Sequence, residues 1–169
     1  PALTSAFSTD PSTVVWVSLA YFLASIGLLL TMGSLGDVTG RDRVFTVGLA
    51  VWTVGLGLAA TATTLPQLIA YRAVQGVGSA MAVATLNALV VAAFPPKQRG
   101  LAMGLAGISV GIGIGAGPFL SGLLLDTLGW RAVFYARVPI GLVGVAMGWA
   151  LLNRERPGGH PQTDFRGAF

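Results

Sequence analysis

The sequence contains no cysteine and only one histidine, His160. The lack of cysteine excludes disulfide bonds, thiolate metal sites and cysteine nucleophiles. A metal site would need several ligands close together, whereas the carboxylates here are few and scattered. A lone histidine also leaves the hydroxyl side chains without a clustered base for nucleophilic catalysis. We therefore expect neither an enzyme nor a bound metal or other cofactor.

Charged residues are also scarce. They make up 9% of the 169 residues and hydrophobic residues 54%, whereas a soluble domain is typically about a quarter charged. The few charges are clustered, which leaves four uncharged stretches, 11–36, 44–71, 73–96 and 100–125. Each stretch exceeds the roughly 20 apolar residues that a bilayer-spanning helix requires. This composition is typical of a membrane protein.

The pattern predicts an all-α membrane protein with five transmembrane helices. The expected spans are residues 14–35, 44–62, 66–94, 101–125 and 133–152. Residues 1–152 would then form one partial bundle. Residues 153–169 are polar and glycine-rich, and we expect them to form a truncated cytoplasmic connector.

Basic residues are distributed unevenly between the two sides of the predicted bundle. One side has Arg41, Arg43, Lys97, Arg99, Arg154, Arg156 and Arg166, whereas the other side has Arg131 alone. Because basic loops stay in the cytoplasm, we expect a cytoplasmic C-terminus and an outer N-terminus. This sorting argues against nucleic acid as a partner. No segment before the first predicted span would carry the N-terminus to the outer side. This indicates a lost upstream span, so we expect the chain to be a fragment.

A short charged stretch, residues 33–45, separates the first two predicted spans. It is too short for a domain linker and too charged to lie in lipid. It therefore predicts a tight connection between two spanning helices. Asp37 within it has two interpretations, an ordinary interfacial capping carboxylate or a group that changes partners as helices move.

Arg72 lies in the third turn of the third predicted span, between apolar residues. An arginine at the centre of a membrane helix costs about 2.5–3.5 kcal/mol on insertion scales. Gln75 and Ser79 follow at i+3 and i+7, so the three side chains share one helix face, and Gly76 thins the helix beside them. A polar stripe of this kind predicts a face directed at protein or at a water-filled cavity. The alternative is an arginine that snorkels to the outer interface, although snorkelling explains neither Gln75 nor Ser79.

The fourth predicted span carries a stripe of glycines. They recur at helical spacing at Gly100, Gly104, Gly107, Gly111 and Gly115. Such a stripe lets another backbone approach closely. Gly113 and Gly117 precede Pro118, which removes a helix hydrogen bond and invites a bend. Close packing alone and a bendable helix at a moving interface both remain open.

Four segments, in order along the chain, resemble motifs of the major facilitator superfamily. Residues 33–41 are similar to its loop motif between the second and third helices, and residues 68–80 to its fourth-helix motif. Residues 113–122 resemble its fifth-helix antiporter motif, and residues 129–141 the entry to its sixth helix. The resemblance is closest to the fourteen-span drug:proton antiporters, and it implies that the chain covers about helices two to six.

The resemblance implies roles for particular residues. A cytoplasmic gate loop would comprise Gly33, Asp37, Gly40, Arg41 and Arg43. Proton coupling or the cavity would involve Arg72, Gln75, Gly76 and Ser79. Bending of the fifth helix during alternating access would depend on Gly113, Gly117, Pro118 and Gly122.

The sequence also departs from the family pattern. Val38 and Asp42 stand where basic residues are usual, which weakens the expected charge relay of the loop. Arg137 occupies a position often held by asparagine and adds a second cation near the outer face. No carboxylate lies within a predicted span at mid-membrane depth, so the proton carrier is expected elsewhere in the transporter.

The resemblance implies an integral protein of a bacterial inner membrane whose full-length parent exports hydrophobic, in part cationic, small molecules in exchange for protons. Its partners would be the lipid bilayer, the substrate, protons and the remainder of the transporter, because alternating access needs two halves around a central site. Two alternatives are an importer or metabolite exporter of the same superfamily, and a non-transporting remnant of a truncated gene.

Overall fold

The computed structural model describes residues 2–152, and helices are the only regular structure within that range. In chain order the elements are α1 (Ala2–Phe7), α2 (Pro11–Gly27), α3 (Leu29–Thr39), α4 (Arg41–Thr61), α5 (Leu65–Ala93), the 3₁₀ turn η1 (Pro96–Gln98), α6 (Arg99–Leu128), α7 (Trp130–Tyr135) and α8 (Val138–Leu152).

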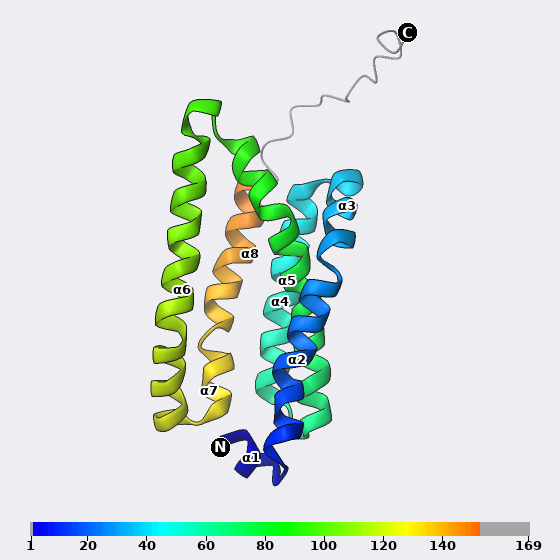
Figure 1. The fold of residues 1–169 in the computed structure, drawn as a ribbon, viewed down its shortest axis with the longest axis vertical. Helices are drawn as coiled ribbons and strands as arrows, with labels where there is room; N and C mark the ends of the chain where they lie inside the picture. Colours follow the sequence, from blue (N-terminus) through cyan, green and yellow to red (C-terminus); the bar gives the residue numbers. More distant parts are fainter. Residues whose placement is uncertain (1, 153–169) are drawn as a thin grey trace.

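Within residues 2–152, four helical segments are long and apolar enough to cross a membrane, and there are five if a bent pair of helices is counted as one span. They are α4, α5, η1 with α6, α7 with α8, and the pair α2 and α3, which is bent by 45°. The junctions α3–α4 and α5–α6 lie at one end of the bundle, and α4–α5 and α6–α7 lie at the other (Figure 1). The predicted fold class, an all-α membrane protein with five spanning helices, is confirmed.

The first span is not the single helix predicted for residues 14–35. It breaks at Leu28 (φ −97°, ψ −4°), and α3 continues to Thr39, beyond the predicted end. Gly27 precedes the break, and a glycine without a Cβ holds helical geometry less firmly than other residues. The last span is also divided, between Tyr135 and Val138. There Pro139 has no N–H to continue the helix from α7, but its fixed φ suits the first turn of α8.

The tightest packing lies between α4 and α5, where glycines bring the two backbones together. A methyl group added to Gly48 would come within 2.9 Å of the Gly78 carbonyl oxygen, and one added to Gly78 would overlap Trp52. Gly55 likewise lies against the backbone of Gln75. Close backbone approach at small residues is the usual basis of helix association in lipid. Nearer the end where α4 meets α5, a small core adds Val17, Ala59, Ala62, Leu65 and Leu68.

Helix α6 stands beside this core rather than within it (Figure 1). Its packing is concentrated on α7 and α5, and of its residues only Ala102 is buried. Large apolar side chains along it are exposed, for example Ile114 at 71% and Phe119 at 75%. Its glycine stripe therefore meets no other helix within residues 2–152.

Candidate functional site

The predicted connection between the first two spans is present, but it is much shorter than residues 33–45. Gly33 and Asp37 lie in α3, Arg41 and Arg43 lie in the first turn of α4, and Gly40 alone separates the helices. Gly40 has φ +104°, a value that residues with a Cβ rarely adopt. One glycine is therefore enough to join the two helices.

Asp37 and Arg41 form an ion pair across this junction. The Nη2 atom of Arg41 lies 2.9 Å from Oδ1 of Asp37, and Nε of Arg41 donates a hydrogen bond to the same oxygen. Both side chains are about half exposed, at 60% and 48%. An exposed i, i+4 pair is worth only about 0.3–0.5 kcal/mol, so either partner can exchange the other for a new one at small cost.

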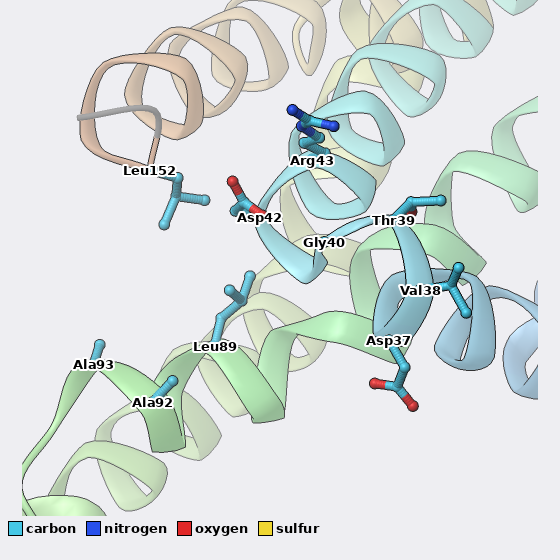
Figure 2. A pocket seen from close by; sticks show the side chains of 10 residues that line it. All are labelled: Asp37, Val38, Thr39, Gly40, Asp42, Arg43, Leu89, Ala92, Ala93 and Leu152. Carbon is cyan, nitrogen blue, oxygen red and sulfur yellow. The ribbon is translucent and has the colours of Figure 1, made fainter. Parts of the chain in front are cut away.

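A groove of about 580 Å³ lies beside the junction, between α3, α4, the end of α5 and Leu152. Figure 2 shows its lining, with the Arg43 guanidinium and the Asp37 carboxylate pointing in different directions. Val38, where the resemblance leads us to expect a basic residue, is 87% exposed. Asp42 also lines the groove, so the groove presents two carboxylates and one arginine.

Arg72 on α5 makes contacts that hold it to α2 and to its own helix. Its Nη1 atom donates to Oε1 of Gln75 at 2.5 Å, and its Nε donates to the carbonyl oxygen of Val17 at 3.2 Å. The guanidinium carbon lies 4.5 Å from the centre of the Tyr21 ring, within the range of a cation–π interaction. These contacts favour the protein-facing interpretation of Arg72 over snorkelling.

Tyr21 completes this cluster, although the sequence patterns did not indicate it. Its hydroxyl is hydrogen-bonded to Oγ of Ser79 at 2.9 Å. A tyrosine within an apolar span usually needs a partner for its hydroxyl, and that signal could have drawn attention to it. Gly76 makes the contact possible, because a methyl group there would come 2.5 Å from the Tyr21 carbonyl oxygen. The structure thus joins Arg72, Gln75 and Ser79 to α2 in one polar cluster.

An open cavity of about 500 Å³ lies next to this cluster, bounded by α1, α2, α5, α6 and α7. Arg72 lines one wall, and Pro118 and Gly122 of α6 line another. Gly113 and Gly117 do not line the cavity, and α6 continues unbroken through Pro118. The structure therefore brings part of the fourth-helix motif (residues 68–80) and part of the fifth-helix motif (residues 113–122) to one cavity.

A second arginine, Arg137, also lines this cavity. It lies in the break between α7 and α8, and its Nη2 donates to Oγ of Ser121 at 2.9 Å. The sequence placed this cation near the outer face but gave no partner for it. The pairing depends on the turn after α6, which returns α7 alongside the end of α6.

Apolar spanning helices around an internal polar cluster and cavity define a polytopic helical membrane protein with a candidate solute site. The chain belongs to the Major Facilitator Superfamily, whose model matches residues 1–168. Proteins of this family are transporters rather than enzymes.

Three similar proteins come from bacteria. The riboflavin transporter RibZ of Clostridioides difficile is 36% identical over 91% of this chain and 34% of its own length. Multidrug resistance protein 3 of Bacillus subtilis is 35% identical over 77% of the chain and 25% of its own length. The tetracenomycin C resistance and export protein of Streptomyces glaucescens is 31% identical over 96% of the chain and 30% of its own length. The chain thus spans about a quarter to a third of the length of these relatives.

Proposed function

We propose that this chain forms part of a secondary active transporter that exports hydrophobic or amphipathic small molecules from a bacterial cell in exchange for protons. The observation that carries the proposal is the polar cluster of Arg72, Gln75, Ser79 and Tyr21 at the edge of a cavity inside an apolar bundle. Ionisable groups within membrane spans are costly and are kept mainly where they face a substrate or ion pathway. Two relatives named for resistance or export support the direction of transport.

In this proposal Arg72 couples proton movement to the substrate site. Its guanidinium is held by Gln75 and by the Tyr21 ring, and it lines the cavity. Protonation of a carboxylate elsewhere in the transporter would change the electrostatic field at the Arg72 guanidinium and the water around this group. Because Gln75 and the Val17 carbonyl hold the guanidinium in place, such a change acts on a fixed charge.

The α3–α4 junction is proposed as a cytoplasmic gate that includes Gly33, Asp37, Gly40, Arg41 and Arg43. The exposed pair of Asp37 and Arg41 is weak enough to open when another helix offers a partner. The neighbouring groove supplies a place for that helix. The proposal that this end is cytoplasmic is supported by Arg41, Arg43, Lys97 and Arg99, which all lie at it.

Helix α6 is proposed to change shape during the transport cycle. Pro118 leaves the carbonyl of Ile114 without its usual helix hydrogen bond, and Gly113, Gly117 and Gly122 surround that point. Since the glycine side of α6 is open within the described residues, bending there would not disturb the α4–α5 core.

Replacing Arg72 by alanine in the complete open reading frame that encodes this chain tests the proposal. In inside-out vesicles export carries a fluorescent hydrophobic dye into the lumen, and this proton-driven accumulation should fall by about tenfold or more, the scale of losing one hydrogen bond to a charged group in a partly desolvated site. Equilibrium binding of the dye without a proton gradient should change less. A merely structural role would lower both in parallel.

A matched control is Arg131→Ala, which removes another arginine that lies outside the cavity. It should leave proton-driven efflux close to wild type at equal expression. Unchanged efflux in Arg72→Ala would contradict the assigned role of Arg72. If the unaltered protein moves no dye under a proton gradient of either direction, proton-coupled export itself is wrong.

Uptake is the second candidate, and the similarity to a protein named as a riboflavin transporter is the observation that favours it. Vesicles of the opposite orientation distinguish the two directions. Accumulation of riboflavin in right-side-out vesicles without an opposing proton flux would favour uptake.

A further inference from the structure

The cavity beside α5 and α6 carries two cations and no carboxylate. Arg72 and Arg137 line it together with the hydroxyl-bearing Ser18 and Ser121. Asp126, the acidic residue nearest to the lining in sequence, does not line the cavity and makes no ion pair among the described residues.

Both arginines retain hydrogen-bond donors for a further partner. A guanidinium has five N–H donors. Within residues 2–152, Arg72 uses Nε and Nη1, and Arg137 uses Nη2 on Ser121. All of their present acceptors are neutral, so neither positive charge is compensated by a counter-ion in this part of the chain.

Two like charges at one cavity raise each other's energy, and an apolar surrounding increases that cost. An anion placed between them offsets it and can accept paired hydrogen bonds from a guanidinium. The remaining walls select the rest of such a ligand. They include Val14, Val17, Trp130 and Phe134, which suit an apolar or aromatic body.

We propose that this cavity binds the anionic group of an amphipathic, aromatic substrate between Arg72 and Arg137, with Arg137 determining the preference for negative charge. This inference rests on the proposed transport function and narrows its substrate class, from hydrophobic compounds in general to those with a carboxylate or a similar anion. It differs from the family resemblance, which implied hydrophobic and in part cationic substrates.

Three dansyl compounds of similar size test the charge preference. Dansylglycine is an anion, dansylglycinamide is neutral and dansylcadaverine is a cation at neutral pH. Binding of each to the purified complete protein is followed by dansyl fluorescence without any proton gradient. We expect dansylglycine to bind most tightly. Arg137→Gln should weaken its binding by about tenfold, as for the loss of one charge-assisted hydrogen bond, and leave dansylglycinamide unchanged.

Two variants make the result specific. Arg137→Lys keeps the positive charge and should restore most of the preference. Arg131→Gln removes a positive charge near the same end of the bundle but outside the cavity, where Arg131 donates to the Ala62 carbonyl and stacks on Trp130. It should leave the order of the three probes unchanged.

Equal binding of the three probes, tighter binding of dansylcadaverine or no binding at all would overturn the proposal. So would an Arg137→Gln variant that weakens all three probes alike, because Arg137 would then support the cavity without recognising the charge of the ligand. Addition of phosphatidylglycerol distinguishes a lipid phosphate from a substrate anion, and displacement of dansylglycine by it would assign the site to lipid. Proton-driven transport without charge preference would refute this inference and leave the proposed function standing.

Discussion

The glycines of α4 and α5 and those of α6 are of the same residue type, but they have opposite surroundings. In α4 and α5, Gly48, Gly55 and Gly78 lie where a methyl group would overlap the neighbouring helix. In α6, a methyl group on any glycine from Gly100 to Gly122 would meet nothing within 4 Å among the described residues. The first group is needed for the bundle to assemble. The glycines of α6 make no close helix contact among the described residues. They therefore serve either movement of α6 or contacts with parts of the protein beyond residues 2–152.

The sharpest test of this difference is Gly78→Ala. The new methyl group would overlap the Trp52 backbone and the Gly48 carbonyl oxygen, and backbone atoms cannot move aside as a flexible side chain can. We expect a loss of about 1–3 kcal/mol or more in folding free energy, as for overpacked cores. The apparent melting temperature of the complete protein in detergent measures it.

Gly57→Ala is the matched control for Gly78→Ala, because Gly57 lies in the same helix pair and has open space around it. It should melt within a degree or two of the wild type, since surface changes usually stay within about 0.5 kcal/mol. Equal melting of the two variants would mean that α4 and α5 do not approach as closely as described.

A smaller effect is expected for Gly40→Ala, where the backbone conformation rather than packing requires glycine. At φ +104° an L-residue with a Cβ is strained by about 1–3 kcal/mol. Part of that strain can relax because the junction is exposed, and the melting temperature should therefore fall less than for Gly78→Ala. Gly100→Ala at the start of α6 is the control, and it should not lower the melting temperature. A fall as large as that of Gly78→Ala would show that the junction is part of the core.

Sequence patterns were sufficient for the spans and for the Arg72 face, because both depend on residues close together in the chain. Charge-free stretches located the first four spans, and helical spacing grouped Arg72 with Gln75. Contacts between distant segments were not accessible in this way. Tyr21 and Ser79 are 58 positions apart, and nothing in their local patterns links them. The sequence also did not predict the break at Leu28 or the one-residue junction at Gly40, because a glycine permits a break or a tight junction without requiring one.

The smallest expected effect on stability is that of Gly111→Ala in the middle of α6. Alanine favours a helix over glycine by up to about 1 kcal/mol, and no atom among the described residues opposes the new methyl group. The melting temperature should therefore stay unchanged or rise slightly, in contrast to Gly78→Ala. Dye efflux by the same protein is the second measurement. If efflux falls while the melting temperature is kept, the open glycines of α6 serve the transport cycle. If the melting temperature falls as well, α6 packs in the complete protein as tightly as α4 and α5 do. The contrast between the two groups of glycines would then belong only to this part of the chain.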